Sequence, residues 1–182
     1  MNLWALPTTH TIHGTTYVLN TDFRDILEII EQLNDENTPE YLRWGIAVAL
    51  FYEQDVPDSD MQEAMEYLAE FISAGSTDDK PGPKLLDWNQ DAQMIVSGVN
   101  KVAGKEIRSV QYMHWWTFIG LFHEIGEGQL STIISIRHKR ATGKKLEKWE
   151  QEFYREHRDK VDFRKPKDPE DEEIKAYFDK WL

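Results

Sequence analysis

The sequence predicts a mainly α-helical protein, a single-domain multi-helix bundle with a small N-terminal β-hairpin. Along most of the 182 residues, apolar side chains recur three and four positions apart, which is typical of helices. The segment 11–20 instead alternates around His13-Gly14 and is rich in Thr, Tyr and Val, which indicates a hairpin. Apolar residues make up 40% of the chain and aromatic residues 12%, enough to fill a core. The absence of cysteine excludes disulfides and thiolate metal sites.

Seven helices are expected after the hairpin. They are placed at about 22–34, from Thr38 through the apolar run 44–52, from Ser59 to Gly75, from Asp87 to Gly104, over 113–125, over 129–142 and over 144–159. Thr38 and Pro39 would supply an N-cap and a first-turn proline. Ser59 with Gln62, and Asp87 with Gln90, have the spacing of capping boxes.

The spacing of apolar residues also predicts which positions face inward. The run WGIAVALFY (44–52) contains no charged residue, so we expect its helix to be buried nearly all round. In the next two helices the apolar positions are Met61, Met65, Leu68 and Ile72, and then Trp88, Ile95, Val99 and Val102.

Residues 1–160 are expected to form the helical domain, with a flexible linker at about 75–84 where Gly and Pro punctuate the chain. Residues 161–182 are expected to be a charged C-terminal tail with a short amphipathic helix. Its aromatic residues, including Phe178 and Trp181, either dock on the chain's own domain or form a recognition helix for another chain. The longest apolar run has nine residues, about half a bilayer span. No signal-peptide pattern is seen, so we expect a soluble protein that does not enter a membrane.

The net charge of −12 is unevenly distributed. Residues 1–136 carry 7 basic and 21 acidic side chains, residues 137–160 carry 9 and 5, and residues 161–182 carry 5 and 7. The acidic bulk would repel phosphate backbones, which argues against nucleic acid as a partner. The basic segment would pair either with the protein's own acidic surface, the commoner arrangement, or with an acidic partner.

The stretch MHWWTFIGLFHEIGEG (113–128) contains residue types that bind metals. A zinc-protease helix carries histidines at i and i+4. Here Glu127 follows His123 at that spacing, and His114 falls on the opposite side of a straight helix. A metal-dependent hydrolase centred on His123, Glu124 and Glu127 is therefore only a rival hypothesis. Because nucleophile-elbow and phosphate-loop motifs are also missing from the sequence, we expect no enzyme and no cofactor.

The same stretch fits a core helix better. Its apolar stripe is formed by Trp115, Phe118, Ile119 and Phe122. Trp115 is expected to be a core anchor. Trp116 lies at the edge of the stripe, so it is either a boundary residue with its indole N–H near water or a contact residue for a partner. His114 is expected to be a hydrogen-bonded structural residue rather than an acid–base catalyst.

The segment GKKLEKWEQEFYREHRDK (143–160) has apolar residues at 146, 149 and 153 with charges between them. It predicts an amphipathic helix carrying i,i+4 ion pairs. The alternative is a cationic helix that presents Lys144, Lys145 and Lys148 to an acidic partner.

Part of the sequence resembles a known family. The segments DWNQDAQMIVSGVNKVAGKEIRSVQYMHWWTF (87–118) and LFHEIGEGQLSTIISIRHKRATGKKLEKWE (121–150) look like bacteriophage proteins named after gene product fifteen. The His-Trp-Trp sequence at 114–116 is the specific part, because adjacent tryptophans after a histidine are rare. The likeness covers about 85–155.

The resemblance implies a phage or prophage protein of tail morphogenesis, similar in position to tail assembly chaperones. It would bind the tape-measure protein and the tail tube protein in the cytoplasm of the bacterial host. The alternative within this class is a minor structural component of the tail. The candidate partner contacts are Trp116, Lys144, Lys145, Lys148, Phe178 and Trp181. Homo-oligomer formation stays open.

Overall fold

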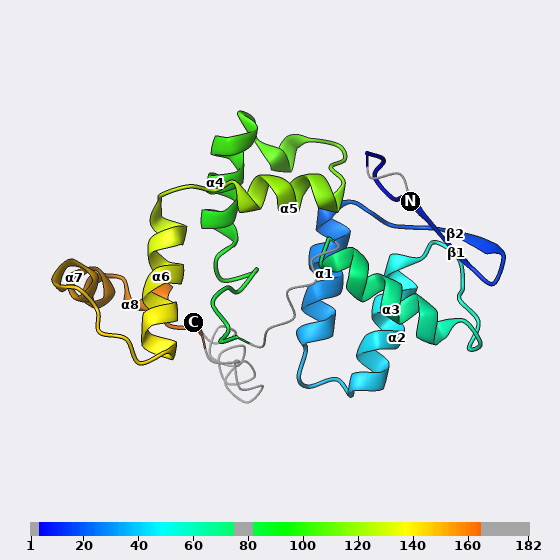
Figure 1. Ribbon diagram of the computed structural model, residues 1–182, viewed down its shortest axis with the longest axis horizontal. Helices are drawn as coiled ribbons and strands as arrows, with labels where there is room; N and C mark the ends of the chain where they lie inside the picture. The colour runs from blue at the N-terminus through cyan, green and yellow to red at the C-terminus, as the bar shows by residue number, and fades with distance from the viewer. Residues whose placement is uncertain (1–3, 75–81, 165–182) are drawn as a thin grey trace, which may run out of the picture.

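The computed structural model describes residues 4–74 and 82–164 and consists mainly of helices, as predicted (Figure 1). The strands are β1 (Thr9–Ile12) and β2 (Thr15–Val18), which pair antiparallel. The helices are α1 (Phe23–Asn34), α2 (Glu40–Phe51), α3 (Met61–Ile72), α4 (Ala92–Ala103), α5 (Trp115–His123), α6 (Gln129–Ala141), α7 (Lys148–Glu156) and α8 (Arg158–Val161). A short 3₁₀ turn covers Ile107–Ser109. The mainly α fold class with an N-terminal hairpin is confirmed.

The hairpin turns where the sequence predicted. His13 has φ 47° and Gly14 has φ 87°, so both central residues are left-handed, as a tight two-residue hairpin turn requires. Ile12, Tyr17 and Leu19 are buried against the helices. The hairpin therefore contributes one apolar face to the core.

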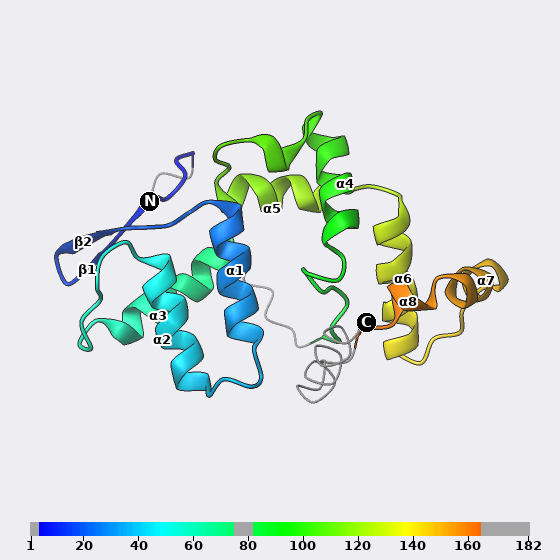
Figure 2. The ribbon, with the colours of Figure 1, turned by 180° about the vertical axis from the view of Figure 1, so that it is seen from behind.

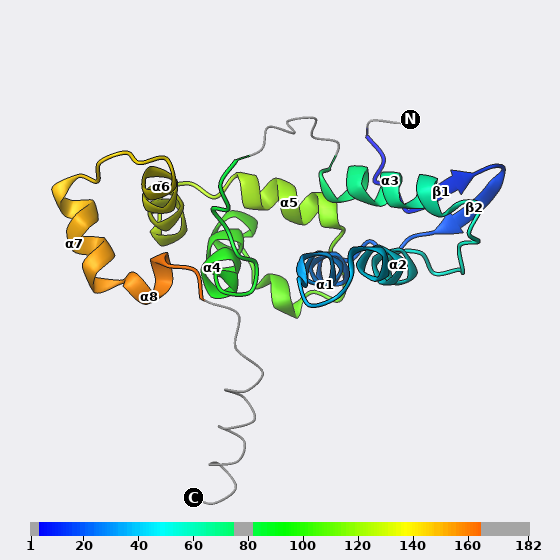
Figure 3. The ribbon, with the colours of Figure 1, turned by 90° about the horizontal axis from the view of Figure 1, so that it is seen from below.

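The helices are spread along an elongated molecule. α1, α2, α3 and the hairpin lie at one end, α6, α7 and α8 at the other, and α4 and α5 between them (Figures 2 and 3). A large core joins the first end to α4 and α5, with Phe51, Phe71, Trp115 and Phe118 among its largest buried side chains. A second, smaller core is formed by Ile133, Ile136 and Val161.

α2 contradicts its predicted burial. Only Ala47, Val48 and Phe51 are buried, whereas Tyr41, Leu42 and Ile46 are exposed. The neighbours α1 and α3 cover one side of the helix and leave the other open. A run of apolar residues shows that every side of the helix could be buried. It does not show how many neighbouring helices are present to bury them.

Three predicted helix starts are wrong in detail. Thr38 does not cap α2, because its hydroxyl donates to Asp35 and Pro39 occupies the N-cap position. Ser59 donates to the Asp60 side chain, and α3 begins at Met61 without a side-chain cap. Asp87 accepts from the backbone N–H groups of Asn89 and Gln90 in a turn, and α4 begins only at Ala92.

The inward faces of the third and fourth predicted helices are confirmed except at one position. In α3 Leu68 is buried, and Met61, Met65 and Ile72 are half-buried and pack against the core. Val102 is exposed, although Ile95 and Val99 are buried as predicted. The predicted stop at Gly104 is confirmed, with φ 67° at the C-cap.

The predicted helix 144–159 is two helices. α7 begins at Lys148 and ends at Glu156, and α8 starts at Arg158 after His157 leaves the helical region with φ −124° and ψ 34°. The chain packs beyond residue 160, because Val161 is buried and the backbone N–H of Arg164 donates to Gln90. The tail aromatics Phe178 and Trp181, and residues 75–81 of the predicted linker, lie outside the described residues.

Candidate interaction surfaces

The His-Trp-Trp sequence joins three parts of the chain. His114 is the N-cap of α5: its Nδ1 accepts a hydrogen bond from the Trp116 backbone N–H at 3.0 Å. Its Nε2 then carries the proton and donates to the Pro7 carbonyl at 3.0 Å. Burial lowers the pKa of His114, so the neutral ring that makes both bonds is the stable form.

Both indoles bind the end of α3. Trp115 Nε1 donates to the Ile72 carbonyl and Trp116 Nε1 to the Phe71 carbonyl, each at 2.9 Å. Carbonyls in the last turn of a helix have no partner within the helix, so Trp115 satisfies the Ile72 carbonyl, which would otherwise need water. The Phe71 carbonyl accepts from Trp116 in addition to the Ala74 N–H. The sequence 114–116 is thus a clasp between the N-terminal segment, α3 and α5, which we call the His-Trp-Trp clasp.

The clasp also meets the start of α1. The Phe23 N–H donates to the Met113 carbonyl and the Trp115 N–H to the Thr21 carbonyl. The Asp22 carboxylate caps α1 through the Arg24 N–H and accepts from the Met113 N–H at 2.9 Å. Two helix starts that are 92 residues apart are therefore fixed to each other.

The predicted packing residues lie in or against the core. Trp115 and Phe118 are both 1% exposed, and Phe122 is half-buried against Trp88. Trp116 is half-buried against Phe71, which places it at the boundary. Its proposed partner contact stays a prediction, and its indole N–H is already bound within the chain.

The residues of the rival metal hypothesis are scattered on the surface. His123, Glu124 and Glu127 are exposed, at the end of α5 and in the connection to α6. Within residues 4–74 and 82–164, no group of three His, Asp or Glu side chains is placed to hold one metal ion.

Most cations at the start of the basic segment bind the protein itself. Arg137 is 4% exposed and donates to the Asp91 carboxylate through Nη1 at 2.5 Å and Nη2 at 3.0 Å. Its remaining N–H groups donate to the carbonyls of Leu85, Lys160 and Val161, so all five donors are used. Lys139 binds the buried Glu150 at 2.8 Å. Sequence reasoning missed the Arg137–Asp91 pair, because 46 residues separate its members.

Three lysines before and at the start of α7 form an open surface. Lys144, Lys145 and Lys148 are exposed and make no ion pair in the described part of the chain. Trp149 beside them is 57% exposed, which corrects its assignment to the apolar stripe of this helix. Leu146 and Phe153, the other members of that stripe, pack against the second core. We call Lys144, Lys145, Lys148 and Trp149 the basic edge.

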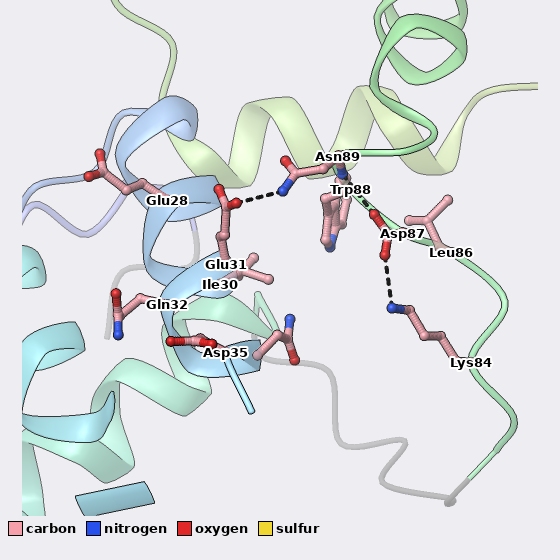
Figure 4. Close-up of a pocket in the computed structure, with 11 residues that line it drawn as sticks. Glu28, Ile30, Glu31, Gln32, Asp35, Lys84, Leu86, Asp87, Trp88 and Asn89 are labelled. Carbon is pink, nitrogen blue, oxygen red and sulfur yellow. Dashed lines mark hydrogen bonds and ion pairs between the residues drawn. The ribbon is translucent and has the colours of Figure 1, made fainter. Parts of the chain in front are cut away.

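A polar groove of about 580 Å³ separates α1 from the segment 84–89 (Figure 4). The Asn89 amide donates to Glu31 across the groove at 2.8 Å, and Lys84 donates to Asp87 on one wall at 2.8 Å. Ile30, Leu86 and Trp88 contribute its apolar lining. The groove is a seam between two elements that the Asn89–Glu31 hydrogen bond joins.

Three large apolar side chains on one side of α2 are exposed in the described part of the chain. Tyr41 is 74% exposed, Leu42 43% and Ile46 41%, and none of the three packs on the core. Gly45 and Ala49 lie between them on the same side. These five residues are the outer face of α2.

Comparison with known proteins connects the clasp to a family. The family model described as Bacteriophage Gp15 protein matches residues 5–163. This chain belongs to the bacteriophage Gp15 family. No curated protein and no solved structure matches it. The match spans the hairpin, the His-Trp-Trp clasp and α8, so it covers both cores. The helices of this Gp15-family protein in the described ranges are too short or too polar to cross a bilayer.

Proposed function

We propose that this Gp15-family protein is a phage tail morphogenesis factor without catalytic activity, and that it acts as a tail assembly chaperone in the host cytoplasm. Its clients would be the tape-measure protein, the tail tube protein or both. The observation that carries the proposal is the outer face of α2, an uncovered apolar surface on a strongly acidic phage protein. Contiguous apolar surface on a protein in water is typical of an interaction site.

The charge of the chain supports this role. A complex with a net charge of about −12 contributed by the chaperone repels other such complexes, which keeps an aggregation-prone client dispersed. The basic edge adds a second surface with an exposed tryptophan, a residue type enriched at binding hot spots. The partner roles of Lys144, Lys145 and Lys148 belong to this proposal.

Co-expression tests the proposal. The tape-measure protein of the same phage, made alone and together with this protein, is fractionated into soluble and insoluble parts. We expect the client to move into the soluble fraction and to co-purify with this protein. No change in client solubility and no co-purification, for both the tape-measure and the tube protein, would refute the chaperone role. Finding the protein in stoichiometric amounts in purified virions would instead support a minor structural component of the tail.

A further inference from the structure

The outer face of α2 is built for contact with another helix. Over about three turns this face consists of Tyr41, Leu42, Gly45, Ile46 and Ala49. The hydroxyl of Tyr41 is the one polar side-chain group among these five residues. Gly45 and Ala49 are one turn apart and lie, around the helix, between Tyr41 on one side and Leu42 and Ile46 on the other. This gives the helix a shallow notch between apolar ridges, into which the ridge of a second helix packs.

No contact within residues 4–74 and 82–164 explains why Gly45 is a glycine. A glycine in a helix interior destabilises it relative to alanine. A Cβ built at Gly45 meets nothing within 4 Å, so no neighbour requires the small residue. Gly98 in α4 is different, because a Cβ there would lie 2.8 Å from Ile125 Cδ1. The close approach that explains Gly98 is inside the molecule, whereas at Gly45 it would come from outside.

The acidic residues around the outer face of α2 favour a positively charged partner. Residues 1–74 contain 14 Asp and Glu, 2 Arg and no Lys, so they account for the whole net charge of −12. Both arginines are engaged: Arg24 binds Asp22, and Arg43 donates to the Leu33 carbonyl. Exposed carboxylates lie at both ends of α2, namely Glu36, Glu40, Glu53 and Asp55, and they form no ion pair within the described ranges. A cationic partner is attracted here and an acidic one repelled.

This charge argues against two other occupants. A second copy bound through the same face about a two-fold axis would bring an equally acidic surface against this one. The chain's own tail, residues 161–182, carries 7 acidic and 5 basic side chains and is also net negative. Neither neutralises the carboxylates around α2.

We propose that the outer face of α2 docks an amphipathic helix of a partner protein, with an apolar stripe seated on Gly45 and Ala49 and Lys or Arg along its flanks. This is the helix-in-groove mode of recognition. The inference deepens the proposed function by giving the chemistry of the client segment, and it rests on that function only for the client's identity.

A designed peptide tests the docking face without any phage client. The probe is a labelled helix of about 18 residues, or five turns, with Leu at i, i+3, i+4 and i+7 and Lys elsewhere. An otherwise identical peptide has Glu in place of Lys. Fluorescence anisotropy with the full chain at low salt is expected to show binding of the Lys peptide and none of the Glu peptide. Absence of Lys-peptide binding, or equal binding of both peptides, would overturn the proposal.

Two face variants and one matched control locate the binding. Gly45→Leu fills the notch with a good helix former, and Ile46→Glu adds charge to a ridge. We expect each to weaken Lys-peptide binding at least about tenfold. Val102→Glu, at an exposed apolar residue of α4 outside both proposed surfaces, is expected to leave the affinity unchanged. Unchanged affinity in both face variants would refute the docking face.

Circular dichroism and thermal unfolding establish that the variants fold. Gly45→Leu is expected to melt no lower than the unchanged chain, because open space surrounds the position. Sedimentation decides the alternative occupant: a dimer of the unchanged chain that Gly45→Leu dissociates would overturn the proposal in favour of self-association. Binding of the peptide together with failure of the co-expression experiment would retain the docking face and remove the tape-measure protein as its client.

Discussion

At the scale of single residues, His114 makes the neutral imidazole part of the fold. One ring nitrogen accepts from the Trp116 N–H while the other donates to Pro7. A doubly protonated ring cannot accept, so protonation breaks the cap. The His-Trp-Trp sequence thus has a structural explanation that involves no client.

This arrangement predicts a pH dependence of stability. Burial lowers the pKa of His114 below its ordinary value, so the unfolded chain binds the proton more readily. Stability is therefore present at neutral pH and is lost as the pH falls below about 6.5, the unfolded value, toward the lowered folded value. We expect the urea concentration at the unfolding midpoint to be lower at about pH 5 than at about pH 7.

The His114→Asn variant serves as the control for that prediction. Asn still offers an oxygen to the Trp116 N–H but does not titrate. Its midpoint is expected to depend less on pH than that of the unchanged chain. Burial also lowers the pKa of His10, so the stability of the variant is still expected to decrease somewhat as the pH falls. Equal slopes in both proteins would contradict the assignment. His114→Ala, which removes the cap altogether, is expected to cost about 1–3 kcal/mol at pH 7.

At the scale of elements, one arginine holds the C-terminal helices to the rest of the chain. Arg137 in α6 binds Asp91 before α4, and its other donors reach carbonyls of the segment 82–91 and of α8. Arg137 is also 4.2 Å from the centre of the Phe163 ring. The second core has few large side chains, so this polar contact takes the place of apolar packing.

Removing the arginine is therefore expected to destabilise the protein strongly. Arg137→Met leaves the fully buried Asp91 carboxylate without its partner, which costs about 3–5 kcal/mol in the free energy of urea unfolding. Arg137→Lys is expected to lose part of the same stability, because an ammonium group with three donors replaces the planar guanidinium with five. The double variant Arg137→Met with Asp91→Leu should recover stability. If Arg137→Met unfolds at the same urea concentration as the unchanged chain, the assigned role is wrong.

At the scale of the whole molecule, the negative charge is concentrated at the end that contains α1 and α2. The first 74 residues carry the entire excess of negative charge, and α1 and α2 lie together at one end (Figure 1). Burial raises the pKa of the Asp25 carboxyl, and the neighbouring Asp22 and Glu28 raise it further. The folded state thus brings like charges together, which opposes folding.

Salt is therefore expected to stabilise the protein. Raising NaCl from about 20 mM to about 300 mM screens repulsion between exposed carboxylates and should raise the melting temperature. The buried Arg137–Asp91 pair is screened much less. The variant Asp25→Asn with Glu28→Gln removes two of the crowded charges, so its melting temperature should rise less with salt. A melting temperature that falls with salt would contradict this prediction.

The sequence alone determined roughly where the helical segments lie, because apolar spacing depends only on local periodicity, and it placed the hairpin turn at His13-Gly14 and the stop at Gly104. It also predicted His114 as a hydrogen-bonded structural residue and Trp115 as a core anchor. Only the tertiary structure decided the rest. The number of covered sides of α2 depends on where α1 and α3 pack, and the partner of Arg137 lies 46 residues away. An apolar run in the sequence does not show which of its residues stay exposed to solvent. At α2 these exposed residues form the proposed docking face.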